Sequence, residues 1–345
     1  MVMARVELSA EPPDVSRGGL PLYDVVIVGA GPIGLACGIE AKKRGLGALI
    51  VEKGALVNSL LGYPTGMEFF STPELLEIGG HPLATTRYKP VREEAIDYYQ
   101  RVALAEQLQL RLYEPVERLD GIDGDFRVKT GRDTYRCRKV VIATGFFDIP
   151  NPLNVPGEDL TKVTHYFKEP FPYAHQDVLV VGGKNSAAKV ALDCFRHGAR
   201  VTLVVRGPEL SPSVKYWIKP DLENRIAEGS ITAHFRTTVE RITEDAVDLM
   251  TPEGMRTVEN DWVLAMTGYQ PDFRFLEALG IDCDSDAARA PYCNSETLET
   301  NRRGVYIAGT VGGGLDTSRW FIENGRVHAQ HIMEHVARSR RITVS

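Results

Sequence analysis

The stretch 23–53 constrains the fold of this chain more than any other. An apolar run at 24–28 leads into GAGPIG at 29–34, a complete GxGxxG at the start of a predicted helix. The helix is expected to end at Gly45, and a second apolar strand follows at 48–51. Strand, glycine turn, helix and strand in one register predict a Rossmann-type unit that binds an adenine dinucleotide.

Each glycine of this turn has a separate expected role. Gly29 permits the tight turn, Gly31 lets a diphosphate approach the backbone, and Gly34 lets the helix lie close to the strand. The free N–H groups of the first helical turn then face the diphosphate. Glu52 lies about 20 residues further on, where a ribose hydroxyl needs an acceptor.

Length and charge restrict the remaining possibilities. A chain of 345 residues predicts two domains, and a net charge of −6 without a basic stripe argues against a nucleic-acid partner. No apolar run approaches the roughly 20 residues of a membrane helix. Residues 1–20 lack a hydrophobic segment of the signal-peptide type, so they are expected to form a disordered tail. A cytoplasmic protein is therefore expected.

The five cysteines include no CxxC pair, so neither a metal site nor a CxxC redox centre is predicted. Cys37, Cys137 and Cys194 are expected to be buried as small apolar residues. Cys283 and Cys293 fall in a polar loop region, where they are expected to be accessible.

A second dinucleotide unit is predicted at 178–205. GGKNSA at 182–187 is a degenerate GxGxxA in which Lys184 stands at the second glycine, between a strand at 178–181 and a helix capped at Gly198. The next strand ends in Arg206, which favours the 2′-phosphate of NADP, with Lys215 and Lys219 as assistants. Alternatively, Arg206 is one solvated charge at a strand end.

The remaining segments complete the expected α/β architecture. The stretch 54–90 is either a wrap around the flavin end of a cofactor or a surface excursion held by its own aromatic residues. A helix at 91–107 and a strand meander at 110–143 follow. The expected domains are an FAD-binding domain of residues 21–148 and 266–345 and an NADPH-binding domain of residues 149–265.

The C-terminal part is expected to hold a final strand at 304–309 and then a helix. Asp316, Thr317 or Ser318 is its expected N-cap, and its dipole either faces a flavin or serves only packing. The expected inner face of this helix carries Gly325, Ala329, Ile332, Met333 and Val336.

Two dinucleotide sites in one chain favour hydride transfer from a nicotinamide to a flavin, which then passes electrons to an acceptor. The motifs GAGPIGLA, YPTGMEFFSTPELLEIG, GGKNSA, SPSVKYWIKP and IAGTVGGG resemble those of the YpdA family of bacillithiol-disulfide reductases, within the thioredoxin-reductase-like flavoproteins. The resemblance covers nearly the whole chain after Leu20. It implies FAD on the first unit, NADPH on the second, and reduction of a low-molecular-weight disulfide.

Two positions depart from that resemblance. The family cysteine proposed for redox chemistry is replaced by Ile33, and the last strand closes with Gly309-Thr310 where related proteins carry Gly-Asp. Cys37 is a candidate substitute; otherwise the acceptor meets the reduced flavin directly, as a disulfide, quinone, second flavin, iron–sulfur protein or oxygen. The alternatives are a diaphorase or ferredoxin reductase, a flavin monooxygenase, and a nucleotide sensor without turnover. FKEPFPY at 167–173 does not match the monooxygenase pattern FxGxxxH.

The expected site residues follow from these motifs, with no catalytic residue assigned and a homodimer expected. The FAD set comprises Gly29, Gly31, Pro32, Ile33, Gly34, Glu52, Lys53, Asn58, Tyr63, Val116, Thr144, Gly145, Gly309 and Thr310. The NADPH set comprises Gly182, Gly183, Lys184, Asn185, Ser186, Arg206 and Lys215.

Overall fold

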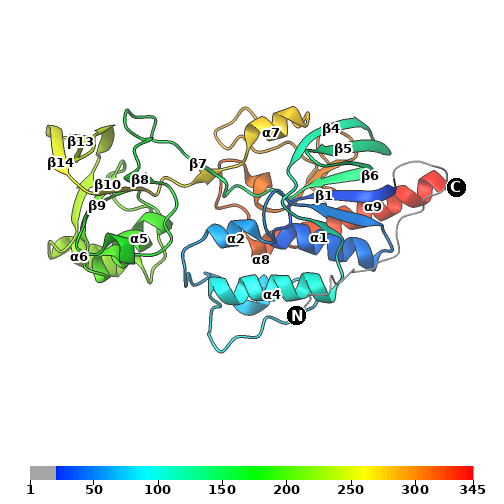
Figure 1. Cartoon of the computed structure of the whole chain (residues 1–345), viewed down its shortest axis with the longest axis horizontal. Coiled ribbons are helices and arrows are strands. Elements are labelled where there is room, and N and C mark those ends of the chain that lie inside the picture. The colour runs from blue at the N-terminus through cyan, green and yellow to red at the C-terminus, as the bar shows by residue number, and fades with distance from the viewer. Residues whose placement is uncertain (1–20, 345) are drawn as a thin grey trace, which may run out of the picture. The chain divides into compact units, whose positions relative to one another are not determined.

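The computed structural model describes residues 21–344, which divide into two compact units (Figure 1). Unit 1 comprises the described residues up to 61, residues 66–149 and the chain from residue 269 onward. Unit 2 comprises residues 62–65 and 150–268. The chain passes between the units through two short paired strands, β7 (Ile149–Pro150) and β16 (Tyr269–Gln270). The tail expected at 1–20 lies outside the described residues.

Unit 1 is built on a seven-stranded sheet with the order β3-β2-β1-β6-β5-β4, and β17 also pairs with β6. Two strands share one side of the nine-residue strand β6. Its first half pairs antiparallel with β5, and its second half pairs parallel with β17. The strands are β1 (Leu22–Val28), β2 (Ala48–Val51), β3 (Leu110–Arg111), β4 (Val116–Ile122), β5 (Asp125–Thr130), β6 (Thr134–Ile142) and β17 (Val305–Ile307).

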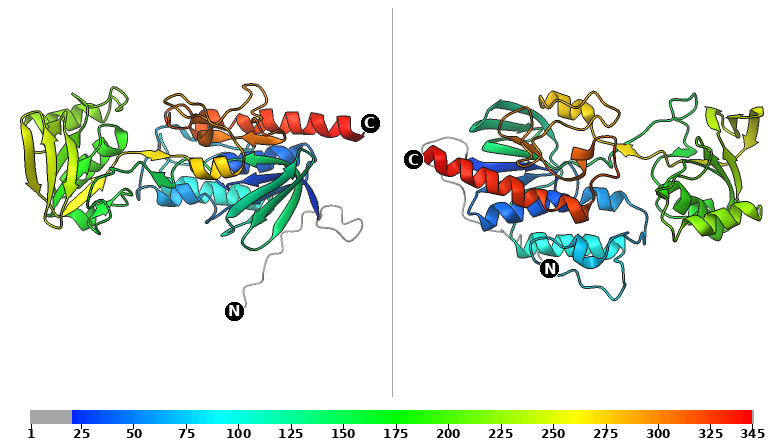
Figure 2. Two further views of the ribbon diagram at one scale, coloured as in Figure 1. Left: turned by 90° about the horizontal axis from the view of Figure 1, so that it is seen from above. Right: turned by 180° about the vertical axis from the view of Figure 1, so that it is seen from behind.

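Apolar residues on both faces of the parallel strands explain why this sheet is covered on both sides. Val26 and Val28 of β1 belong to a core shared with the strand meander, whereas Ile50 of β2 faces α1 at Gly38. Helix α9 lies alongside α1 (Figure 2). The helices are α1 (Pro32–Lys43), α2 (Asn58–Gly62), α3 (Pro73–Leu76), α4 (Arg92–Ala105), α7 (Phe273–Ala278), α8 (Ile322–Gly325) and α9 (His328–Val344).

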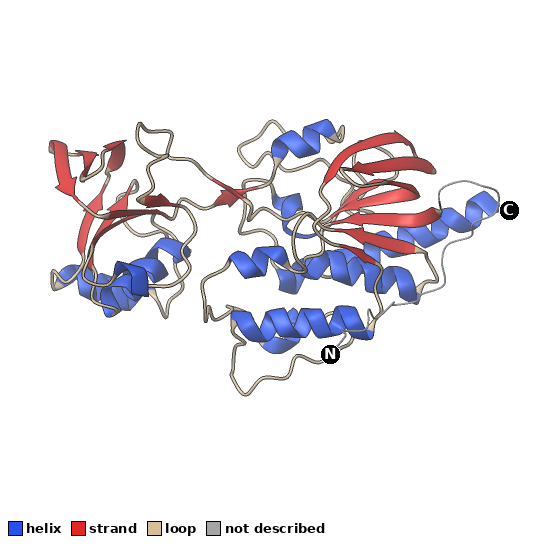
Figure 3. Cartoon of the chain, in the orientation of Figure 1, coloured by secondary structure: helices blue, strands red, loops and turns tan. Residues whose placement is uncertain are grey.

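Unit 2 has a parallel five-stranded sheet with the order β11-β10-β9-β15-β8. Successive side chains of β9 point to opposite faces of this sheet. Val178 and Val180 pack with helices α5 and α6 on one face, whereas Leu179 packs on the other face with a separate three-stranded sheet, β12-β13-β14 (Figure 3). The elements are β8 (Val163–Thr164), β9 (Asp177–Val181), α5 (Asn185–Arg196), β10 (Arg200–Val205), α6 (Lys219–Ala227), β11 (Thr232–Phe235), β12 (Thr238–Ile242), β13 (Ala246–Thr251), β14 (Gly254–Glu259) and β15 (Trp262–Ala265). The predicted α/β class with two Rossmann-like domains is confirmed.

One predicted helix start is wrong. The C-terminal helical region begins at Ile322 with Phe321 as N-cap, and not at Asp316, Thr317 or Ser318. The Asn324 side chain accepts the Phe321 N–H at 2.7 Å, which fixes the start there. The helix is also interrupted after Gly325, and α9 begins at His328. Its predicted inner face is confirmed, since Gly325, Ala329, Ile332, Met333 and Val336 are all buried.

No helix within residues 21–344 is long and apolar enough to cross a membrane.

Candidate functional site

The first glycine turn joins β1 to α1, and its three glycines are constrained in different ways. Gly29 has φ 109°, and a Cβ there would lie 2.6 Å from the Ala143 carbonyl oxygen. A Cβ on Gly34 would overlap the Gly29 carbonyl oxygen. Gly31, the N-cap of α1, has φ −71° and no atom within 4 Å of such a Cβ. Gly29 and Gly34 are therefore needed by the fold, whereas the space at Gly31 is open to a ligand.

Glu52 follows β2 and bonds back to this turn. One carboxylate oxygen accepts the Ala30 N–H at 2.7 Å, and the other accepts the Gly54 N–H at 2.9 Å. Burial raises the pKa of Glu52, and the two backbone N–H groups oppose that effect. The carboxylate is therefore oriented before any ligand binds, with lone pairs left for a ribose hydroxyl.

The ends of three neighbouring parallel strands meet beside the turn. A Cβ on Gly145, after β6, would lie 3.4 Å from the Thr310 hydroxyl, and Thr310 follows β17. Because ligands of parallel α/β sheets bind beyond the carboxyl ends of the strands, Thr144, Gly145, Gly309 and Thr310 are placed for cofactor contact.

The other residues of the predicted FAD set are more dispersed. Lys53 forms an ion pair with Asp148 at 2.8 Å, and Asn58 accepts the Ala55 N–H of its own loop at 3.3 Å. Val116 begins β4 and packs against the sheet core. Tyr63 falls in the short segment 62–65 that belongs to unit 2. Their contact with a cofactor stays a prediction.

Ile33 is buried at the start of α1 beside the end of β17. A Cβ on Gly309 would lie 2.9 Å from Ile33 Cγ1, and a Cβ on Gly325 would lie 3.6 Å from Ile33 Cδ1. Gly309 has φ 77°, and its N–H donates to Nδ1 of buried His328 at 3.1 Å. Burial lowers the pKa of His328 to about 4, so the ring is neutral at pH 7.

Sequence reasoning did not single out His328. His328 stands directly before Ala329 of the apolar face of α9, a place in the sequence that does not mark it as a functional residue. The edge of the Trp320 ring meets the His328 ring at 4.4 Å between centroids.

The cysteines offer no activated thiolate in place of the family residue. Cys37 is fully buried in α1, and burial raises the pKa of its thiol to about 12. Cys137 and Cys194 are buried as predicted, and burial also raises the pKa of each to about 12. Cys283 and Cys293 are partly exposed, yet burial still raises the pKa of both. Nucleophilic cysteines need the opposite shift.

The second glycine turn joins β9 to α5 and is equally tight. A Cβ on Gly182 would lie 2.5 Å from the Met266 carbonyl oxygen, and one on Gly183 would lie 2.8 Å from Val205 Cγ1. Lys184 is the N-cap of α5 with φ −109°, a conformation open to any residue. A lysine can therefore replace the second glycine without backbone strain.

Next to this turn, the side-chain amide of Asn185 forms hydrogen bonds within the protein. Its Nδ2 donates to the Ser213 carbonyl at 2.9 Å, and its Oδ1 accepts the Lys215 N–H at 2.9 Å, which ties the loop 211–215 to the start of α5. Ser186 and Arg206 are exposed. The Lys215 ammonium lies 5.9 Å from the centre of the Trp217 ring.

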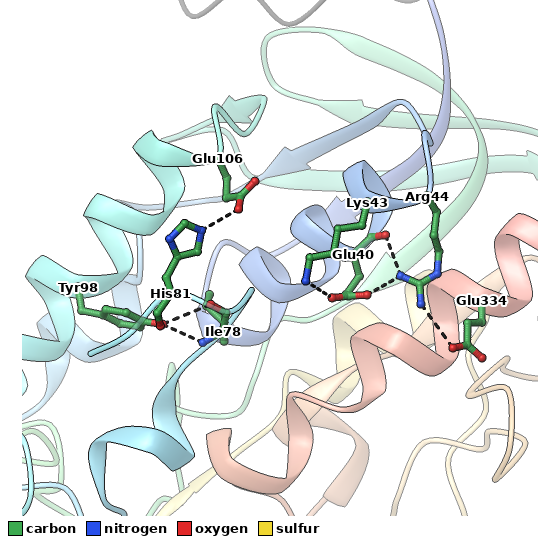
Figure 4. A network of polar contacts seen from close by, with 8 residues as sticks. All are labelled: Glu40, Lys43, Arg44, Ile78, His81, Tyr98, Glu106 and Glu334. Atoms are coloured by element: carbon green, nitrogen blue, oxygen red, sulfur yellow. Dashed lines mark hydrogen bonds and ion pairs between the residues drawn. The ribbon is translucent and has the colours of Figure 1, made fainter. Parts of the chain in front are cut away.

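The second half of the long segment 54–90 is held by Tyr98 of α4 and by Glu106, the residue after that helix (Figure 4). The Tyr98 hydroxyl accepts the Ile78 N–H at 2.8 Å and donates to the His81 carbonyl at 2.8 Å. The His81 ring contacts Glu106 at 2.7 Å. Arg44, paired with Glu40, also reaches Glu334 of α9 at 3.4 Å. The aromatic residue in these contacts is Tyr98 of α4 and not one of the segment's own, so both the wrap around a flavin and the excursion held by its own aromatic residues stay predictions.

The residues of unit 1 fit an adenine dinucleotide. The space in front of Gly31, the first N–H groups of α1, the buried Glu52 carboxylate and the strand ends at Gly145 and Thr310 form one cradle at the carboxyl edge of the sheet. The two oxygens of the Glu52 carboxylate accept N–H groups of the turn itself.

Comparison with known proteins identifies the family. The family model for pyridine nucleotide-disulphide oxidoreductases matches residues 26–309, and the chain belongs to this family. It is an FAD- and NADPH-dependent oxidoreductase. It is 45% identical over 315 residues to the bacilliredoxin reductase Bdr of Bacillus subtilis, covering 91% of this chain and 97% of that protein.

Solved structures agree with this result. The chain is similar to the bacillithiol disulfide reductase Bdr (YpdA) of Staphylococcus aureus, with a TM-score of 0.89, 41% identity, and coverage of 92% of this chain and 99% of that one. The corresponding Bacillus cereus structure has a TM-score of 0.90 at 41% identity, with the same coverage. The resemblance stated from the motifs is thereby confirmed. Thioredoxin reductase of T. acidophilum, with a TM-score of 0.74 at 20% identity and coverage of 94% and 99%, shares the fold alone.

Proposed function

We propose that the protein binds FAD on the first glycine turn and NADPH on the second, and reduces a low-molecular-weight disulfide of the bacillithiol disulfide type. The observation that carries this proposal is the 45% identity to a bacilliredoxin reductase over 91% of the chain. The overall reaction converts NADPH, one proton and the disulfide into NADP⁺ and two thiols.

The chain's own residues supply binding and orientation. FAD held on the first glycine turn would supply two-electron chemistry between NADPH and the acceptor. Gly31 leaves room for the diphosphate, the first N–H groups of α1 bind it, and Glu52 accepts from the ribose. In unit 2, Gly183 and Lys184 present the backbone of the second turn to the NADPH diphosphate.

No cysteine of the protein takes part in the proposed reduction of the disulfide. Ile33 occupies the position of the family cysteine and packs against Gly309, so no mixed disulfide forms at that position. Cys37, one turn further along α1, is buried, and its thiol pKa of about 12 keeps it protonated. The disulfide must then accept electrons from the reduced cofactor itself.

Ile33 also favours a second candidate function. A flavoenzyme without a redox cysteine needs no disulfide acceptor, so a diaphorase that reduces a quinone or a redox protein is the alternative. Both functions share the reduction of FAD by NADPH and differ only in the acceptor.

An anaerobic stopped-flow experiment tests the proposal. The purified yellow protein is reduced with NADPH and then mixed with bacillithiol disulfide, a quinone or oxygen while absorbance at 450 nm is followed. Reoxidation by the disulfide at equal rates in wild type and Cys37→Ser supports the proposal. Reoxidation only by the quinone or a protein carrier makes the protein a diaphorase. Lack of bleaching by NADPH would contradict both.

A matched variant separates the two thiol routes. Ile33→Cys restores the family residue, whereas Ile33→Val keeps an apolar side chain of similar shape. If reoxidation by the disulfide accelerates in Ile33→Cys alone, a thiol route can be restored on this frame. If wild type and Ile33→Val already react as fast as Ile33→Cys, the direct route is supported.

The expected assembly and location complete the proposal. We propose a homodimer, supported by the resemblance to related flavoproteins, and a location in the cytoplasm, supported by the lack of an apolar run of membrane-helix length in the sequence. Light scattering coupled to size-exclusion chromatography gives the mass in solution. A monomer mass near 38.2 kDa would contradict the dimer.

A further inference from the structure

Two arginines follow neighbouring strands of unit 2 at the edge where its glycine turn lies. Strands β10 and β11 run parallel, with Val205 opposite Phe235. Arg206 and Arg236 are the next residues of the two strands, so they emerge side by side at the carboxyl edge of the sheet. Arg236 lies 30 residues from Arg206 in the sequence, and only the strand register brings the two together.

The backbone fixes Arg236 beside Arg206. The Arg236 N–H donates to the Gly207 carbonyl at 2.8 Å, and the Thr237 N–H donates to the Val205 carbonyl at 3.2 Å. The chain after β11 thus folds over the end of β10 on both sides of Arg206. Arg236 has φ 52°, a left-handed conformation that is uncommon for a residue with a long side chain. Such outliers concentrate at ligand-binding sites.

The charges of these two arginines are not used within the fold. Both residues are exposed, and neither guanidinium has a hydrogen bond or ion pair with any residue that the structure describes. Four other arginines of the same unit form ion pairs within the described residues, namely Arg196, Arg200, Arg225 and Arg241, whereas Arg256 on β14 is also without one. Arg206 and Arg236 thus place two guanidinium groups without an acidic partner at adjacent strand ends, where an anion can accept hydrogen bonds from both.

The glycine turn lies against the same strand end. The Gly182 N–H donates to the Val204 carbonyl at 2.9 Å, and a Cβ on Gly183 would lie 2.8 Å from Val205 Cγ1. In a Rossmann unit, the residue after the second strand meets the adenosine ribose of the dinucleotide. Here that residue is Arg206, and Arg236 is its neighbour.

We infer that Arg206 and Arg236 together bind the 2′-phosphate of NADPH, and that Arg236 is a specificity-determining residue for NADPH over NADH. The inference rests on the proposed placement of NADPH on unit 2. A phosphate carrying nearly two negative charges accepts hydrogen bonds from two guanidinium forks, whereas the free 2′-hydroxyl of NADH makes little use of them.

Direct binding tests this inference without depending on the acceptor. NADP⁺ and NAD⁺ are titrated into the oxidised holoenzyme by calorimetry, for wild type, Arg206→Ala, Arg236→Ala and Arg236→Lys. Arg241→Ala, an exposed arginine of the same unit, is the matched control. Stopped-flow reduction of the flavin by NADPH and by NADH is measured for the same proteins.

Removal of Arg236 is expected to weaken NADP⁺ binding by about 10-fold to 100-fold, the range for a lost hydrogen bond to a charged group. NAD⁺ binding should change less than about twofold, because NAD⁺ has no 2′-phosphate. Arg236→Lys should fall between wild type and Arg236→Ala, and Arg241→Ala should match wild type. The preference for NADP⁺ should also weaken as salt rises.

Two results would overturn the inference. Unchanged NADP⁺ binding in Arg236→Ala means that Arg236 does not contact the phosphate. Equal losses for NADP⁺ and NAD⁺ mean a purely structural role. A wild-type holoenzyme that binds neither nucleotide would instead contradict the placement of NADPH on unit 2, while failure of disulfide reduction alone leaves the inference intact.

Discussion

Replacing two glycines of the same turn by alanine should have opposite consequences for stability and cofactor binding. In Gly34→Ala, the new Cβ overlaps the Gly29 carbonyl oxygen, a backbone atom that cannot rotate away. In Gly31→Ala, the new Cβ meets no atom within 4 Å, and φ of −71° suits alanine. Gly34 is therefore required for folding, whereas Gly31 is required only by what binds in front of it.

The expected magnitudes follow from these contacts. Gly34→Ala forces α1 away from β1, at a cost of about 2–3 kcal/mol, the upper part of the range for overpacked sites. For a domain of this size, that cost lowers the melting temperature of the apoprotein by about 5–10 °C. Gly31→Ala should change the stability of the apoprotein by less than about 1 kcal/mol. Its methyl group instead fills the diphosphate site, so FAD affinity should fall by about 10-fold or more.

Two measurements separate these effects. The flavin content of the purified protein comes from the ratio of absorbance at 450 and 280 nm, and melting curves are recorded after the flavin has been removed. Gly31→Ala should purify colourless or pale with a wild-type apoprotein melting temperature. The reasoning is refuted if Gly31→Ala binds FAD like wild type, or if the Gly34→Ala apoprotein melts with wild type.

Three further predictions concern buried polar groups. Tyr98→Phe leaves the buried Ile78 N–H without its acceptor, so we expect a loss of about 1–3 kcal/mol in urea unfolding, whereas Tyr216→Phe at an exposed position should change nothing. Lys162→Met removes a buried ammonium that donates to the Glu244 carbonyl and twice to Asn260. It should lower the melting temperature of unit 2 more than the control Lys189→Met on α5, and equal shifts would contradict this. The pKa of His328 is about 4 in the folded protein against 6.5 in the unfolded chain, so the unfolded chain binds more protons between these pH values. The free energy of unfolding therefore falls as pH drops from 6.5 to 4, by up to about 3 kcal/mol. His328→Asn should flatten this pH dependence of the melting temperature, and an unchanged slope would argue against it.

Local motifs made much of unit 1 predictable. The glycine turn at 29–34, the helix end at Gly45 and the helix over 92–105 depend on neighbours within a few residues, and each is found where the pattern indicated. The break between α8 and α9 was not predictable in this way. Arg326, at the break, keeps helical backbone angles, and its side chain donates to the Glu74 and Glu77 carbonyls, about 250 positions earlier in the chain.

The candidate sites also contain residues that local spacing predicts and residues that only distant contacts bring together. The turn glycines and Glu52 could be named from their spacing, and Arg206 from its place after a strand. His328 and Arg236 could not, since their relevance comes from a contact with Gly309 in one case and from the register of β10 with β11 in the other. Residues that act across strands leave no fixed spacing in the sequence.

Ile33 shows how one position can separate the chemistry of this family from its fold. The residue lies inside the glycine motif, but the turn depends on Gly29 and Gly34, so residue 33 can vary without disturbing α1. The Ile33 side chain packs against Gly309 and Gly325, neither of which has a Cβ that would compete for this space. A cysteine there would fill less of it and leave a small cavity, at a cost of about 1 kcal/mol. In this chain, isoleucine is thus better packed at position 33 than a cysteine would be.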